Sequence, residues 1–288
     1  MQLIELGDTR VVTVAPSDSI DRAISLLEEN DFRHLPVVDR GQILGMVSDR
    51  DLLSAVGMQH DEERLSSSPG SGRIGATRID QIMSTPARTA AAEDSLQHGA
   101  QLMLDAGIRA IPLVYRDRLA GIVTETDFLK CYLNDRPICK MQGWRLQLVR
   151  DHMTPNVKTL KPTDGFLHAA RMMHTHRFRH IPIVEGDMLV GIVSDRDMRR
   201  FLGTMEIDRA EEADMPARAR GHVTMQDVMT TDVTNTTDDA TLAEVAEILV
   251  NRKFGSLPVV NDGELKGIIT EADLLRHVVD ACREGEVK

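Results

Sequence analysis

The stretch His34-Leu35-Pro36-Val37-Val38 decides the fold, because its pattern returns three more times along the chain. In each copy a short apolar run surrounds a proline, a glycine follows nine residues later, and an aspartate follows fifteen residues later. The prolines are Pro36, Pro112, Pro182 and Pro258; the glycines are Gly45, Gly121, Gly191 and Gly267; the aspartates are Asp51, Asp127, Asp197 and Asp273. Three landmarks held in register four times indicate an internal repeat.

The spacing of the copies indicates how the repeats are grouped. The four prolines are separated by 76, 70 and 76 residues, and the first and third copies share the strings Phe-Arg-His and Ser-Asp-Arg-Asp. This alternation indicates a two-repeat unit that was duplicated whole. The predicted repeats cover residues 1–58, 79–135, 149–203 and 223–284, which form one module over 1–135 and a second over 149–284.

Each repeat predicts the same local structure, which can be followed in the first copy. Residues 11–14 are a short apolar strand, and a helix is expected from Ile20 after the start signal Ser17-Asp18-Ser19. Two apolar strands at 35–38 and 43–47 flank a turn, and a second helix follows from about Asp49. The fold class is therefore α/β (α+β), built from β–α–β–β–α units. One such unit exposes an apolar sheet face, and pairing two units covers it.

Composition limits the classes of partner. The net charge is −11 and only nine residues are aromatic, which argues against nucleic acid, because that partner needs clustered cations or stacking rings. The apolar runs are far shorter than a membrane span, and the first five residues show no signal-peptide pattern. The three cysteines, Cys131, Cys139 and Cys282, are too scattered for a disulfide framework, so we expect a cytoplasmic protein.

The repeats resemble the cystathionine-β-synthase (CBS) domain over nearly the whole chain. The strings that carry the resemblance are Arg33-His34-Leu35-Pro36-Val37-Val38, Gly45-Met46-Val47-Ser48-Asp49-Arg50-Asp51, Met83-Ser84-Thr85-Pro86, Met153-Thr154-Pro155 and Met229-Thr230. By this resemblance each pair of repeats forms one Bateman module, and two modules form a flat disc. The plan is similar to that of the AMP-activated kinase gamma subunit.

The resemblance also implies a ligand, an adenine nucleotide of the AMP, ADP or ATP type bound between paired repeats. A hydroxyl and a carboxylate at the start of each second helix would hold the ribose. The matching residues are Ser48 and Asp51, Thr124 and Asp127, Ser194 and Asp197, and Thr270 and Asp273. The structural alternative is that each pair is a helix capping box, and one pair can serve both purposes.

Phosphate groups need cations, and the resemblance assigns these to the residues just before each proline. The candidates are Arg33, His34, Arg109, Arg179 and His180. The Thr124/Asp127 pocket is expected to receive Arg33 and His34, and the Thr270/Asp273 pocket Arg179 and His180. The Ser48/Asp51 pocket would receive only Arg109. The Ser194/Asp197 pocket would face Gly255 and Ser256, and we expect it to bind phosphate poorly.

Other sites are less favoured. The histidines at 168, 174, 176 and 180 alternate with arginines that oppose a metal ion, so no metal site is expected. No GxSxG, P-loop or GxGxxG motif is present, so we do not expect an enzyme. The single Trp144 is interpreted as a packing residue.

The main hypothesis is a stand-alone regulatory protein, with a role such as energy sensing, that signals nucleotide binding to a partner protein. The chain either forms a disc by itself or dimerises. The alternative is an interaction scaffold without ligand, and a weaker one is an S-adenosyl or nucleic-acid ligand.

Overall fold

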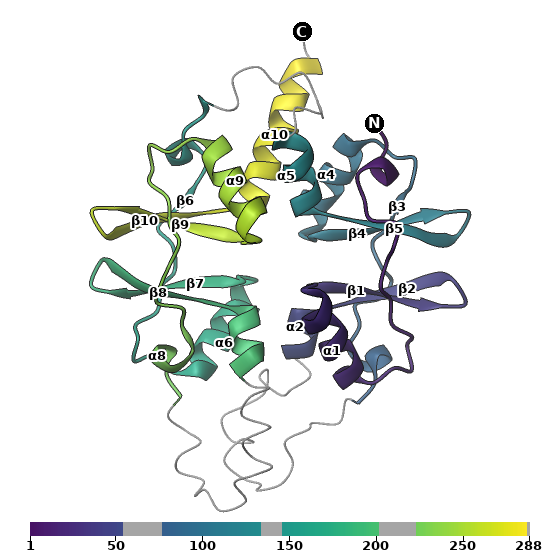
Figure 1. Ribbon diagram of the computed structural model, residues 1–288, viewed down its shortest axis with the longest axis horizontal. Helices are drawn as coiled ribbons and strands as arrows, with labels where there is room; N and C mark the ends of the chain where they lie inside the picture. The colour runs from purple at the N-terminus through teal and green to yellow at the C-terminus, as the bar shows by residue number, and fades with distance from the viewer. Residues whose placement is uncertain (54–76, 134–145, 202–222, 287–288) are drawn as a thin grey trace, which may run out of the picture.

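The computed structural model describes residues 1–53, 77–133, 146–201 and 223–286. Viewed down its shortest axis, the molecule is a disc with one repeat at each corner (Figure 1). Four β-hairpins point outward to the sides, and the helices gather along the line where the two modules meet. Trp144 and Cys139 lie outside the described residues.

The first repeat shows how the predicted elements form. Ser19 accepts a hydrogen bond from the Arg22 amide at 3.2 Å and begins α1, and Ile20, Ala23 and Leu27 are buried on one face of that helix. The hairpin strands β1 and β2 are antiparallel and begin and end within one residue of the prediction. The elements are η1 (Leu3–Glu5), α1 (Ile20–Asn30), β1 (His34–Asp39), β2 (Gln42–Ser48) and α2 (Asp49–Leu53).

The other three repeats follow the same order. The second contains η3 (Ile79–Gln81), β3 (Ala90–Ala91), α4 (Leu96–Ala106), β4 (Ala110–Tyr115), β5 (Arg118–Thr124) and α5 (Glu125–Leu133). The third contains η5 (Val149–Asp151), β6 (Thr154–Pro155), α6 (Phe166–His176), β7 (His180–Glu185), β8 (Met188–Ser194) and a helix over 195–201. The fourth contains α8 (Met225–Val228), α9 (Leu242–Arg252), β9 (Ser256–Asn261), β10 (Glu264–Thr270) and α10 (Glu271–Glu286).

The strand predicted at residues 11–14 is wrong. Only Val14 pairs with the sheet, through a single parallel bridge to Val37. Val11 and Val12 instead line a cavity, and Pro16 follows the bridge. The segment therefore touches the sheet edge at one point and leaves it, because proline cannot donate a ladder hydrogen bond.

Each module is held together by an exchange of N-terminal segments. Ser84 of the second repeat pairs with Met46 on β2, and Asp8 of the first repeat pairs with Ile122 on β5. The second module repeats this exchange, with β6 against β10 and Thr230 against Ile192. The two hairpins of a module are therefore joined by backbone hydrogen bonds as well as by apolar packing.

The exchange explains the glycine that follows each proline by nine residues. A Cβ at Gly45 would lie 2.7 Å from the Ser84 carbonyl oxygen, and one at Gly267 would lie 2.8 Å from that of Thr154. The corresponding contacts at Gly121 and Gly191 are with Asp8 and Thr230. The glycines are needed because the exchanged backbone passes directly over them.

The two seams between the modules differ in chemistry. Repeats 2 and 4 share apolar packing: Leu275 and Val279 of α10 belong to the core of repeat 2, and Leu129 of α5 belongs to the core of repeat 4. Repeats 1 and 3 meet through ion pairs instead. The buried Arg199 lies 2.9 Å from Asp49 and 2.7 Å from Glu28. Both seams bring the inner ends of the hairpins together at the centre of the disc (Figure 1).

Candidate functional site

The four Ser/Thr–Asp pairs all have the same local geometry. In each, one carboxylate oxygen accepts hydrogen bonds from the backbone amide and the hydroxyl of the Ser or Thr three residues before it. The hydroxyl-to-carboxylate distances are 2.6 Å for Ser48–Asp51, 2.7 Å for Thr124–Asp127, 2.6 Å for Ser194–Asp197 and 2.7 Å for Thr270–Asp273. Every pair therefore caps the helix that follows, as predicted. Capping uses one carboxylate oxygen, Oδ2, and leaves Oδ1 for other contacts.

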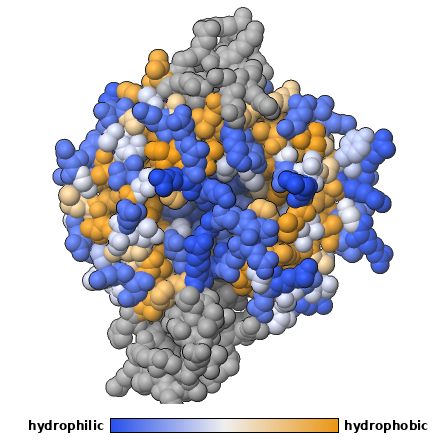
Figure 2. Space-filling model, in the orientation of Figure 1, coloured by the Kyte–Doolittle hydropathy of each residue, from blue (hydrophilic) through white to orange (hydrophobic). Residues whose placement is uncertain are grey.

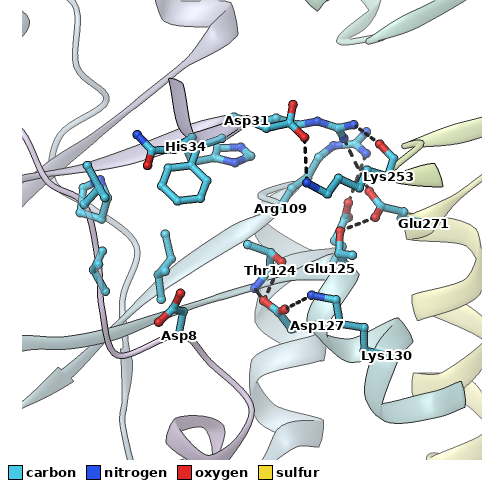
Figure 3. A pocket seen from close by; sticks show the side chains of 18 of the residues that line it. Asp8, Asp31, His34, Arg109, Thr124, Glu125, Asp127, Lys130, Lys253 and Glu271 are labelled. Atoms are coloured by element: carbon cyan, nitrogen blue, oxygen red, sulfur yellow. Dashed lines mark hydrogen bonds and ion pairs between the residues drawn. The ribbon is translucent and has the colours of Figure 1, made fainter. Parts of the chain in front are cut away.

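One pair opens on a cavity of about 340 Å³ that begins between the first two repeats and is also lined by residues of the third and fourth. Figure 3 shows Thr124 and Asp127 at one end of this cavity, with His34 across from them. The exposed Lys130 lies 3.1 Å from Asp127 Oδ1. The apolar part of the lining comes from Val11, Val12, Pro36 and Ile122. The cavity thus has one polar end and an apolar wall, as pockets for small ligands commonly do.

The structure brings Arg33 and His34 into the same cavity as Thr124 and Asp127, which is the pairing that the sequence suggests. Arg33 also donates a hydrogen bond to the Lys253 carbonyl oxygen at 3.1 Å and so reaches across to the fourth repeat. The role of these side chains in ligand binding remains a prediction.

Arg109 and Arg179 also line the Thr124/Asp127 cavity. Their assignment from the sequence, Arg109 to the Ser48/Asp51 pocket and Arg179 to the Thr270/Asp273 pocket, remains a prediction. In the disc the inner hairpin ends of both modules converge, and the long guanidinium side chains extend across the centre.

Two buried carboxylates, those of Glu125 and Glu271, also lie at this centre, and neither was predicted from the sequence as a site residue. Arg109 Nη1 lies 3.2 Å from Glu125 Oε2, and Arg33 Nη1 lies 3.8 Å from Glu271 Oε2. Arg179 Nη2 lies 3.9 Å from both carboxylates. Burial raises the pKa of Glu125 against the opposing effect of the arginines. A signal was present in the sequence: the residue after the Ser or Thr is Asp in repeats 1 and 3 and Glu in repeats 2 and 4.

Two donor atoms of the Arg179 side chain lack hydrogen-bond partners in the structure. Its side chain is only 8% exposed, yet its Nε and Nη2 atoms donate no hydrogen bond. Burial, together with the charges of Arg109 and Arg33, lowers its pKa to about 9. Buried donors are normally satisfied, and an arginine without acceptors is the kind of exception that an anion accounts for.

Gly255 occupies the position that corresponds to Arg33, Arg109 and Arg179 in the other repeats. A Cβ there would lie 2.9 Å from Arg33 Nη1 and 3.4 Å from Arg179 Nη2. The neighbouring Ser256 is buried, and its hydroxyl has no hydrogen-bond partner. The fourth repeat therefore contributes space to the centre where the others contribute arginines.

The two histidines do not act as cations here. Burial and the nearby arginines lower the pKa of His34 to about 3 and hold that of His180 well below its usual value. Both imidazoles are therefore neutral at pH 7 and can contribute a hydrogen bond but no positive charge.

This lowered pKa makes a measurable contribution to the pH dependence of stability. Below pH about 6.5 the unfolded chain protonates His34 while the folded chain does not, so stability falls as the pH falls. We expect His34→Gln to reduce the slope of unfolding free energy against pH by about 1.4 kcal/mol per pH unit between pH 6 and 4. Urea unfolding of both proteins at several pH values measures it. Equal slopes would contradict the burial of a neutral His34.

Comparison with known proteins places this arrangement in a family. The CBS domain matches residues 4–57, 79–134, 149–204 and 225–280. The chain is a CBS-domain protein. Together the four matches cover most of its length, with one domain for each repeat.

Two relatives match this CBS-domain protein from end to end. The protein MJ1225 of Methanocaldococcus jannaschii is 26% identical over 275 residues, which cover 93% of this chain and 95% of the relative. A 33.4 kDa protein from the ribosomal RNA operon of Thermofilum pendens is 28% identical over 290 residues, which cover 96% and 91%.

The crystal structure of MJ1225 is described as that of a proposed archaeal homologue of the AMPK gamma subunit. It matches this structure with a TM-score of 0.83 at 25% identity, over 96% of this chain and 99% of MJ1225. The plan of four CBS domains in a disc is thus shared over the whole chain.

Within the part of the chain that the structure describes, no helix combines the length and the apolar character needed to cross a membrane. Within the same residues no three His, Cys, Asp or Glu side chains gather as ligands for a metal ion, and His168, His174 and His176 are exposed.

Proposed function

We propose that this CBS-domain protein is a regulatory protein, without catalytic activity of its own, that binds an adenine nucleotide in the cavity between repeats 1 and 2. One observation supports this most strongly. The cavity has a carboxylate suited to ribose at one end, and the buried Arg179, whose Nε and Nη2 lack acceptors, lines the same space.

The chemistry of the two ends supports a nucleotide over other small molecules. Capping uses only Asp127 Oδ2, and Oδ1 is held by the exposed Lys130 at 3.1 Å; a ribose hydroxyl that displaces this surface ammonium group can donate to Oδ1. Guanidinium groups suit phosphate through paired, charge-assisted hydrogen bonds. The apolar wall offers a surface for a base. A volume of about 340 Å³ is near the lower limit of ligand pockets, so we favour a nucleoside monophosphate such as AMP.

A ligand in this cavity would act on the whole disc. Its lining includes Arg33 from repeat 1, Thr124 from repeat 2, Arg179 from repeat 3 and Lys253 from repeat 4. Because the site is assembled from both modules, a bound nucleotide would favour the relative position in which these residues converge. A ligand shifts such an equilibrium through its differential affinity for the two positions. A partner protein would then recognise the favoured shape, as in energy sensing.

The likeness to MJ1225, itself described as a proposed homologue of the AMPK gamma subunit, is consistent with a regulatory role. The alternative is an interaction scaffold that binds no ligand. All four Ser/Thr–Asp pairs cap the helices that follow them, and this structural role explains the pairs without a nucleotide.

Thermal unfolding with AMP, ADP, ATP, GTP and S-adenosylmethionine tests the proposal. A ligand at one hundred times its dissociation constant should add about 2.7 kcal/mol of stability. We expect a saturable rise in Tm with adenine nucleotides, largest for AMP, and none with GTP. If no compound raises Tm at millimolar concentration, the scaffold alternative is correct. A shift with S-adenosylmethionine alone would replace the nucleotide by that ligand.

A further inference from the structure

The centre of the disc holds five charged groups linked by ion-pair contacts of 3.2 to 3.9 Å. Three guanidinium groups, from Arg33, Arg109 and Arg179, contact the carboxylates of Glu125 and Glu271. Figure 3 shows Arg109, Glu125 and Glu271 beside the cavity. Both glutamates are the first residues of their helices, α5 and α10, and their side chains are 5% and 4% exposed. These buried carboxylates line the cavity in which we propose that a phosphate binds.

Comparison among the four repeats shows that a glutamate holds this position in repeats 2 and 4, whereas repeats 1 and 3 have the shorter Asp49 and Asp195. In repeat 1 the corresponding residue is Asp49, whose shorter side chain pairs with Arg199 at the ionic seam. In repeat 2 the longer Glu125 reaches Arg109 and Arg179. A helix start accepts either acid equally well. The extra methylene therefore brings a negative charge to the arginine cluster.

The charges of this cluster balance poorly once a phosphate enters. The five groups in direct contact, three guanidinium groups and two carboxylates, carry a net charge of about +1, and Asp195 of repeat 3, which acts electrostatically on Arg179, reduces this further; a phosphate monoester carries about −1.5 to −2 at pH 7. An excess of buried negative charge is costly, and a carboxyl group reduces that cost by taking up a proton. Glu125 is the candidate, because its carboxylate makes the closest ion-pair contact of the cluster, 3.2 Å to Arg109, which a phosphate would replace, and because burial already raises its pKa.

Glu271 has different contacts from Glu125. It pairs with Arg33 in place of Arg109, and its Oε1 accepts a hydrogen bond from the Thr126 hydroxyl at 2.6 Å. The other charged or titratable groups that face the cluster or line the cavity are His34, His180, Asp195, Arg196, Lys253, Lys130, Asp127, Asp31, Asp8 and Arg10.

We propose that Glu125 is an internal competitor of the ligand phosphate, which holds Arg109 and Arg179 in the empty chain and takes up a proton when the phosphate replaces it. This inference rests on the proposed function. Nucleotide binding is then coupled to proton uptake by Glu125. Affinity falls as pH rises, because Glu125 is ionised in a larger fraction of the free molecules and must be protonated when the nucleotide binds. Titration of the phosphate, with pKa near 6, has the opposite effect, since its charge increases with pH.

Calorimetric titration of the full chain with AMP tests this. At pH 7.5, measurements in two buffers with different ionisation enthalpies give the number of protons taken up, and we expect up to about one. Affinity should fall several-fold, and at most about ten-fold per pH unit for one proton, between pH 6.5 and 8.5. A wild-type chain that binds AMP without proton uptake would overturn this inference and leave the proposed function intact. A chain that binds no nucleotide would overturn both.

Variants assign the proton to one residue. Glu125→Gln should abolish the uptake and raise AMP affinity at pH 8.5 by about ten-fold, because a neutral amide does not compete for the arginines. Glu271→Gln is the matched control, and His34→Gln tests the nearby imidazole; both should keep the uptake. Uptake that persists in Glu125→Gln, or disappears in either of the other two, would contradict the assignment to Glu125.

Discussion

Asp127→Ala is expected to weaken AMP binding about 100-fold, whereas Asp197→Ala should change it less than about two-fold. The reason is that Asp127 lines the cavity, where its carboxylate can accept hydrogen bonds from ribose hydroxyls, while Asp197 is not among the residues that line it. Two hydrogen bonds to a charged group are worth about 3 kcal/mol together, which is about 100-fold in affinity. Calorimetric titration of the three proteins with AMP measures the difference.

The pair of variants separates ligand binding from capping. Both aspartates accept hydrogen bonds from the amide and the hydroxyl of the preceding Thr or Ser, so both substitutions remove an equivalent cap. Each variant should therefore lose a similar stability, about 0.5–2 kcal/mol. An equal loss of AMP affinity in the two variants would mean that Asp127 acts through stability alone.

Gly45→Val should destabilise the chain by about 3 kcal/mol and lower Tm by roughly 10 °C. The new Cβ would lie 2.7 Å from the Ser84 carbonyl oxygen. That carbonyl cannot move away, because it accepts the Met46 amide while the Ser84 amide donates back to Met46. The exchanged segment of repeat 2 would have to leave the sheet of repeat 1. Thermal and urea unfolding measure the loss.

Gly165→Ala is the control for this substitution. Gly165 precedes α6 with φ −76°, and no atom lies within 4 Å of its Cβ position. An alanine fits this backbone, so we expect a change of less than about 1 kcal/mol. Similar losses at Gly45 and Gly165 would show that the exchanged segment does not constrain the glycine.

Most of the secondary structure was predictable because its causes are local. The Ser19 cap, the apolar face of α1 and the turn between β1 and β2 each depend on residues within about one or two turns of chain. The Ser/Thr–Asp caps lie within four residues and were recognised in all four repeats. The predicted strand at 11–14 failed because the path of that segment depends on the partner repeat, whose Ile122 pairs with Asp8.

The candidate site was predictable only in part. Internal repetition and the resemblance to a family suggested that Arg33 and His34 meet Thr124 and Asp127, which are some 90 residues away in sequence, and the cavity contains all four. That Arg109 and Arg179 line the same cavity was not predicted, because their convergence depends on contacts across the disc and not within one module.

Repetition, helix caps and strand alternation could be identified in the sequence alone, because hydrogen bonds between near neighbours and the period of apolar residues depend on short stretches of chain. The central cluster needed the tertiary structure. Arg33, Arg109, Arg179, Glu125 and Glu271 come from four repeats, and they meet only because one seam packs apolar helices and the other pairs charges. The same packing buries these groups, so it also sets the raised pKa of Glu125 and leaves two donors of Arg179 without acceptors.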